Sequence, residues 1–172
     1  DLRSATEGAE LIIVDNASDA GTSAALQAMN PTIYIRNETN LGFAAGNNQG
    51  YARATGDVIM FLNSDVAAAP DWLRAVVADV RDGALYGPAL QAQLVAGRHV
   101  PYLEGWCLAA TAATWERLRD DAFRDAEMAK QGIGVFPSVG WLGPWDALAY
   151  PGPYWEDNDL CLRALQQGIQ LV

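Results

Sequence analysis

Residues 58–65 read Val58-Ile59-Met60-Phe61-Leu62-Asn63-Ser64-Asp65, an apolar run that ends abruptly in polar residues. A short apolar run bounded by turn-forming residues predicts a strand buried on both faces. Glu10-Leu11-Ile12-Ile13-Val14 follows nearly the same pattern and leads into the polar residues 15–19. Both stretches therefore predict buried strands with polar loops at their carboxyl ends.

Helical and extended patterns alternate around these two strands. We expect helices at residues 23–29, 70–80, 111–119 and 156–167, and further strands at residues 33–35, 105–110 and 169–172. Residues 40–48 lead into another expected helix, which runs through Tyr51 and Ala54 and stops at Gly56. This order is typical of βαβ units, so the sequence predicts an α/β fold with a mostly parallel central sheet and helices on both faces. Ligands bind such sheets beyond the carboxyl ends of the strands. The Gly, Pro and Trp-rich residues 132–154 are expected to form a functional loop.

Length and charge limit the function classes. The 172 residues fit a single domain, residues 1–172, and the formal charge of −10 with 11 Lys and Arg argues against a nucleic acid polymer as partner. No apolar run approaches the ~20 residues that span a bilayer. We therefore expect a cytoplasmic domain, with the inner face of the membrane as an alternative location reached only through other parts of the protein or through the acceptor.

For several reactive side chains the sequence predicts structural roles. Cys107 and Cys161 lack metal-ligand spacing and are expected to be free, buried thiols. His99 has no second ligand at useful spacing and is expected in an exposed loop. Asp159 and Arg163 stand four residues apart, which predicts a surface ion pair on a helix.

Polar residues at the strand ends are the first candidates for chemistry. Asp65 follows closely on a rigid strand, where its carboxylate could hold Mg²⁺ or Mn²⁺ together with a diphosphate. Asp15 and Asn16 could hydrogen-bond a nucleoside. Turn formation explains each of these residues equally simply, so the local sequence leaves both readings open.

A second candidate is the acidic cluster that follows Tyr154 and Trp155. Glu156, Asp157 and Asp159 lie within four residues at an expected helix start, where anions are stabilised. Helix capping explains one or two of them, whereas mutual repulsion and partial burial would adapt one carboxylate to general-base catalysis. Trp141, Trp145 and Trp155 could stack on a sugar, or be buried in the core or an interface.

Four stretches, in this order, resemble the inverting family 2 glycosyltransferases and, within them, the rhamnosyltransferase-like branch. They are residues 11–18 (LIIVDNAS), 40–48 (NLGFAAGNN), 60–65 (MFLNSD) and 154–163 (YWEDNDLCLR). The resemblance implies a GT-A-like fold in which Asp65 ligates the metal, Asp157 is the catalytic base and Glu156 is the alternative base. It implies that the donor is bound by Asp15, Asn16, Asn40, Gly42, Asn47, Asn63 and Ser64.

The implied reaction moves a sugar from a nucleoside diphosphate, dTDP- or UDP-linked, to a hydroxyl of a glycan or glycolipid acceptor, with inversion, in polysaccharide or glycolipid synthesis. Mg²⁺ or Mn²⁺ would stabilise the leaving diphosphate. Asn63 stands where many members have the first aspartate of a DxD motif. The family's first strand, expected before residue 10, is not recognisable, and its usual later segment would lie past Val172, so we expect a fragment of a longer domain or protein.

Two other classes compete with this reading. A catalytically inactive nucleotide-sugar-binding or scaffold domain would keep the same fold. A nucleotidyltransferase would also use carboxylate-held metal, but the Gly-rich basic phosphate loop that such enzymes carry near their start is not found here.

Overall fold

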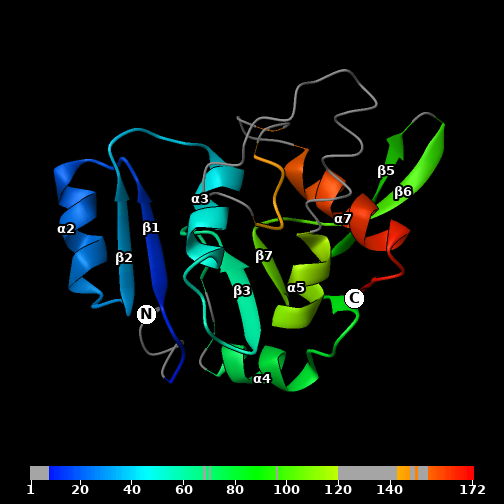
Figure 1. The fold of residues 1–172 in the computed structure, drawn as a ribbon, viewed down its shortest axis with the longest axis horizontal. Helices are drawn as coiled ribbons and strands as arrows, with labels where there is room; N and C mark the ends of the chain where they lie inside the picture. The colour runs from blue at the N-terminus through cyan, green and yellow to red at the C-terminus, as the bar shows by residue number, and fades with distance from the viewer. Residues whose placement is uncertain are drawn as a thin grey trace.

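The computed structural model describes residues 8–67, 69, 71–95, 97–119, 143–147, 150 and 155–172. Strands and helices alternate along the first part of the chain, which confirms the α/β class (Figure 1). In chain order the elements are β1 (Ile12–Asn16), α2 (Ala20–Ala28), β2 (Ile33–Asn37), α3 (Phe43–Tyr51), β3 (Val58–Leu62), α4 (Trp72–Asp79), β4 (Ala84–Leu85), β5 (Leu90–Val95), β6 (Arg98–Leu103), β7 (Cys107–Thr111), α5 (Ala112–Leu118), α7 (Glu156–Gln166) and β8 (Gln170–Leu171).

The described strands form both parallel and antiparallel pairs. β1 runs parallel to β2 and β4 parallel to β8, as expected of βαβ units. β3 pairs antiparallel with β7, and β5 antiparallel with β6. A bridge between Tyr86 and Ala109 connects the residue after β4 to β7. The described strands thus form four two-stranded sheets, two of them parallel and two antiparallel.

Helices cover both faces of β1. Ile12 and Val14 point toward α3, where a Cβ added to Gly50 would lie 3.5 Å from Val14 and 3.9 Å from Ile12. Asp15 points to the opposite face and accepts a hydrogen bond from Ser23 of α2. Successive side chains of a strand alternate between its faces, so α2 and α3 lie on opposite sides, as predicted.

The hydrophobic core lies where β3, β7, α5 and α7 meet. Phe61 packs edge-on against Trp115 at 4.9 Å and against Trp145 at 5.5 Å between ring centroids. Trp115 also donates its indole N–H to the Ile59 carbonyl at 2.9 Å. Aromatic pairs in this edge-to-face geometry add to the stabilisation from burial. Trp145 is thus a core residue; Trp155 is exposed, and Trp141 lies outside the described residues.

Several element boundaries differ from expectation. Helix α2 begins at Ala20, earlier than predicted, because the Asp19 carboxylate caps the Gly21 and Thr22 amides. Helix α3 ends at Tyr51 instead of continuing through Ala54 to a stop at Gly56, and its C-cap, Ala52, has right-handed geometry. Helix α4 begins at Trp72 after an Asp71 N-cap, while Pro70 lies outside the described residues.

The β5–β6 hairpin was not predicted. His99 lies in β6 opposite Leu94, so the expectation of a loop at His99 was wrong, although its side chain is exposed as expected. Pro101 lies within β6, and a proline inside a run normally argues against a strand. Both cysteines are free, as predicted; Cys161 is buried, whereas Cys107 is only half-buried. Of the expected loop at residues 132–154, only 143–147 and 150 are described.

Candidate functional site at the strand ends

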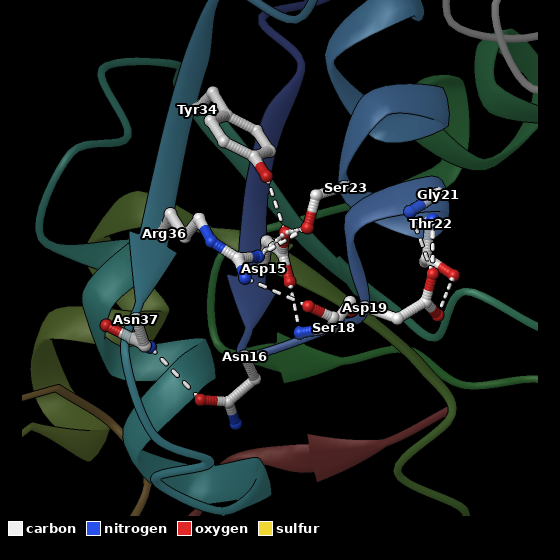
Figure 2. Close-up of polar contacts among 10 residues, drawn as sticks. All are labelled: Asp15, Asn16, Ser18, Asp19, Gly21, Thr22, Ser23, Tyr34, Arg36 and Asn37. Carbon is white, nitrogen blue, oxygen red and sulfur yellow. Dashed lines mark hydrogen bonds and ion pairs between the residues drawn. The ribbon is translucent and has the colours of Figure 1, made fainter.

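Asp15 is the centre of a buried polar network at the end of β1 (Figure 2). Its carboxylate accepts hydrogen bonds from the hydroxyls of Ser23 and Tyr34 and from the amide of Ser18, and it forms an ion pair with Arg36. Arg36 also donates to the Ser18 carbonyl at 2.9 Å. The network fixes the turn that follows β1 against β2.

This network stabilises the charged form of Asp15. Burial by itself would raise the pKa of the carboxyl, but the hydrogen bonds from Ser23, Tyr34 and Ser18 outweigh burial and hold the pKa well below its ordinary value. The side chain has no exposed surface. Asp15 is therefore a buried anion, and both of its carboxylate oxygens accept hydrogen bonds from the protein itself.

Asn16, Asn40 and Gly42 are brought together in one amide cluster. The Asn16 side chain donates to Asn40 Oδ1 at 2.9 Å and to the Gly42 carbonyl at 3.0 Å. Its own oxygen accepts from the Leu41 amide at 2.9 Å and from the Asn37 side chain at 3.1 Å. Gly42 has φ of 85°, a conformation that favours glycine. The cluster joins the end of β1 to the start of α3.

Neighbouring amides on α3 have different surroundings. Asn47 is half-buried and donates to the Phe43 carbonyl at 3.1 Å. Asn48 is buried; it donates to the Trp145 carbonyl at 2.7 Å and accepts from the Trp145 amide at 3.1 Å. A Cβ at Gly143 would lie 2.2 Å from Asn48 Oδ1, so only glycine fits there. Asn48 thus fixes residues 143–145 onto α3.

Asn63, Ser64 and Asp65 follow β3, as predicted. The backbone N–H of Asn63 donates to the Trp106 carbonyl at 2.9 Å, which extends the β3–β7 pairing by one residue pair. Ser64 and Asp65 are exposed. Within the described part of the chain, no group of three or more His, Cys, Asp and Glu side chains could hold a metal. One carboxylate with neighbouring oxygen donors can still suit Mg²⁺, which also binds substrate phosphates and water.

Asp157 lies in the first turn of α7 and contacts the β6–β7 connection. Its Oδ2 accepts from the Gly105 amide at 3.3 Å, and its Oδ1 accepts from the Asn158 amide at 2.8 Å. Glu156 is buried in the same turn. Trp155, just before them, has φ of 76°, which is uncommon for a bulky residue. Such strained residues gather at functional sites.

The contacts of Gly105 and Trp106 bring two of the predicted motifs together. Gly105 donates to Asp157, and the next residue, Trp106, accepts from Asn63. The end of β3 and the first turn of α7 therefore both contact the dipeptide Gly105-Trp106, although Asn63 and Asp157 are far apart in the sequence.

Arg163 is a cross-link between elements and not a surface residue, which corrects the expectation of a surface ion pair. The predicted pair with Asp159 is present at 2.8 Å, but the two side chains are only 16% and 23% exposed. Arg163 also donates to the carbonyls of Leu118 at 2.8 Å and Pro144 at 2.7 Å. Because Asn48 binds Trp145 and Arg163 binds Pro144, residues 144–145 connect α3 to α7.

Sequence reasoning missed the residues that support the candidates. Tyr34 and Arg36 point to the same face of β2, and Asp15 pairs directly with Arg36 in the strand register. The alternation of Tyr34, Ile35 and Arg36 was the available signal, because residues two apart in a strand share a face. Asn48 and Gly105 gave no comparable signal, since their partners are distant in sequence.

Fold and site together define an α/β protein in which polar side chains follow the ends of β1 and β3. The model of the family described as "Glycosyl transferase family 2" matches residues 2–135. The chain belongs to this family, which supports glycosyl transfer as its class of reaction and implies the GT-A-like α/β fold. The match ends before α7, so the roles of Glu156 and Asp157 depend on the resemblance and on the geometry.

One curated relative is the "Uncharacterized glycosyltransferase YfnE" of Bacillus subtilis (strain 168). It is 40% identical over 65 residues, which cover 36% of this chain and 17% of that protein. The chain thus aligns with less than a fifth of the relative's length. Among the helices that the structure describes, none is long and apolar enough to cross a membrane.

Proposed function

We propose that the chain carries the donor site and the base of an inverting glycosyltransferase, whose donor is a nucleoside diphosphate sugar and whose acceptor is a hydroxyl group. The observation that carries this proposal is the dipeptide Gly105-Trp106, which contacts Asn63 at the end of β3 and Asp157 on α7. A transferase needs its donor and its base within reach of one anomeric carbon. The shared dipeptide supports that requirement.

Donor contacts are assigned to the edge formed by β1, β3 and the start of α3. Asn16, Asn40, Gly42 and Asn47 would hold the nucleoside side, and Asn63 and Ser64 the diphosphate side. Asp15 would act by holding the turn after β1, because its side chain has no exposed surface with which to contact a base or ribose. The donor favoured by the resemblance is dTDP- or UDP-linked.

Asp65, with oxygen atoms of Asn63 and Ser64 nearby in the sequence, would hold Mg²⁺ or Mn²⁺. The donor set fits such an ion because it offers oxygen ligands and leaves room for phosphate oxygens. The ion, when bound, neutralises charge on the leaving diphosphate.

Asp157 would take the proton of the acceptor hydroxyl, with Glu156 as the alternative base. The acceptor oxygen then forms a bond to the anomeric carbon while the bond from that carbon to the diphosphate oxygen breaks. Attack from the side opposite the leaving group inverts the anomeric centre, and the nucleoside diphosphate departs. The Gly105 N–H positions Asp157 for this step.

Calorimetric titration tests the donor site. The purified protein is titrated with UDP, dTDP and GDP, each with and without Mn²⁺, and the series is repeated on Asp65→Ala. We expect metal-dependent binding of one nucleotide that weakens at least about tenfold in the variant, a change of ~1.4 kcal/mol. Asp79→Ala, an exposed carboxylate near the end of α4, is the matched control and should bind as the parent does.

Asp157→Asn separates transfer from donor binding. The variant should keep its nucleotide affinity and lose transfer, measured as product formed from the nucleotide sugar that binds. A parent protein that binds the nucleotide but transfers to no acceptor would favour the alternative function, an inactive nucleotide-sugar-binding domain. The observation that favours this alternative is that Asp15 is buried and bound by residues of the protein itself. Absence of nucleotide binding under every condition contradicts both functions.

A further inference from the structure

Strand β5 has one edge without a strand partner among the described residues. Within the residues that the structure describes, β5 pairs only with β6, and β6 is the strand that packs along α7. Figure 1 shows this hairpin at the periphery of the molecule, beside α7. Leu90 and Leu94 are 57% and 64% exposed. A strand with an unpaired edge offers a row of N–H and C=O groups to another strand.

Two common protections of a sheet edge, charged residues and proline, are absent from β5 itself. Strands at sheet edges commonly carry charged residues or proline, which prevent pairing with other chains. Residues 83–97 contain no charged side chain, and the strand itself contains no proline, in a chain whose formal charge is −10. The strand therefore adds no charge of its own to the repulsion between two copies of this acidic chain.

The sequence of β5 is self-complementary. Residues 90–94 read Leu90-Gln91-Ala92-Gln93-Leu94, which is the same in both directions. When two copies pair antiparallel around a twofold axis at Ala92, Ala92 faces its own copy, each Leu90 faces a Leu94, and each Gln91 faces a Gln93. Every side chain then meets one of its own size and polarity on the same face, which favours cross-strand pairing.

The backbone also fits this axis. Ala92 is paired with Pro101 of β6, and proline has no N–H to donate. This position fits the non-hydrogen-bonded type of antiparallel pair, in which the Ala92 N–H and C=O point away from β6 toward the open edge. Ala92 of a second copy could then exchange two hydrogen bonds with it.

From these observations we propose that β5 is a dimerisation strand, and that two copies of the chain join through β5 in a continuous sheet of the order β6–β5–β5–β6. The axis at Ala92 makes the contact isologous and closed, so pairing stops at two copies. The exposed leucines become an apolar strip across the axis. Short strands that meet at their edges bury little surface, so the dimer should dissociate on dilution.

Sedimentation equilibrium of the full chain over a range of concentrations tests the proposal. The parent protein should change from monomer to dimer as its concentration rises. Ala92→Glu places two carboxylates opposite each other and should raise the dimer dissociation constant at least about tenfold. Ala92→Thr, which favours strands without adding charge, should leave the constant nearly unchanged.

A pair of double variants checks the register. Gln91→Glu with Gln93→Lys places opposite charges across the axis and should strengthen the dimer, whereas Gln91→Lys with Gln93→Lys places like charges there and should weaken it. Circular dichroism confirms that both retain the fold. Equal effects of the two double variants would overturn the proposed register.

Cross-linking gives an independent readout. A cysteine at Ala92 would face its own copy at ~5.5 Å between Cα atoms, within the range that a disulfide spans. A cysteine at Gln93 would face Gln91 and lie too far from its own copy to bridge. Oxidised Ala92→Cys should therefore run as a dimer and Gln93→Cys as a monomer. A parent protein that stays monomeric at every concentration, with no cross-link at Ala92, overturns the proposal.

Discussion

The backbone N–H of Gly105 donates a hydrogen bond to Oδ2 of Asp157 across 3.3 Å, so the β6–β7 connection fixes the candidate base from outside its own helix. A Cβ on residue 105 would lie 3.1 Å from the Asp157 Cβ, tighter than an ordinary contact. The position therefore controls where the carboxylate of Asp157 lies.

Gly105→Ala should reduce glycosyl transfer at least about tenfold and leave nucleotide affinity within about twofold, because small displacements of a base reduce rates strongly. Steady-state kinetics with separate calorimetric titration measures both quantities. Gly50→Ala is the control glycine variant and should leave both unchanged. An equal loss of transfer and nucleotide affinity would contradict a role confined to Asp157.

Gly50→Ala should also stabilise the protein, by about 0.5–1 kcal/mol. Gly50 lies inside α3, where glycine is less favourable than alanine. Its added methyl would meet Val14 at 3.5 Å and Ile12 at 3.9 Å, which are ordinary contacts. Urea unfolding monitored by circular dichroism measures the free energy of unfolding. A decrease would show that α3 lies closer to β1 than the structure has it.

Asn48→Ala should lower the free energy of unfolding by about 2–4 kcal/mol. It removes two buried hydrogen bonds and leaves the Trp145 amide and carbonyl without these partners. Asn47→Ala is the matched neighbour and removes one half-buried bond. It should cost less than about 1 kcal/mol, and under the proposed function it should weaken nucleotide binding. Urea unfolding and calorimetry distinguish the two variants.

Asp15→Asn should lower the free energy of unfolding by about 3 kcal/mol, because it leaves Arg36 without its buried anion. The pKa of Asp15 is lowered in the folded protein. Its contribution to stability is therefore complete above about pH 4, the ordinary pKa of aspartate, and is lost as pH falls further. Urea midpoints from pH 7 to pH 2 should fall more steeply in the parent than in Asp15→Asn.

A parallel fall in the two proteins would mean that Asp15 does not contribute to acid sensitivity. Ser23→Ala removes one donor to the same carboxylate and should give an intermediate slope. Asp19→Asn alters a cap on α2 that is exposed to solvent, so it should affect stability less than Asp15→Asn.

The sequence by itself determined the α/β class, β1, β2, β3, β7, α5, α7 and the polar residues where β1 and β3 end. These features depend on periodicity and on caps, which act between neighbours in the chain. Even the pairing of Asp159 with Arg163 followed from helical spacing. The β5–β6 hairpin was missed although residues 90–94 alternate between apolar and polar side chains, because Pro101 argues against a strand in its second half.

Only the tertiary structure decided which residues support the candidates. The partners of Asn48 and Gly105 are 97 and 52 residues away in the chain, and no local pattern encodes such contacts. Arg163 changed from an expected surface ion pair to a cross-link because residues 118 and 144 fold over its helix. Asp15 became a buried anion because α2 and β2 bring a hydroxyl, a phenol and a guanidinium to it. Burial and long-range hydrogen bonding exist only once the elements have packed.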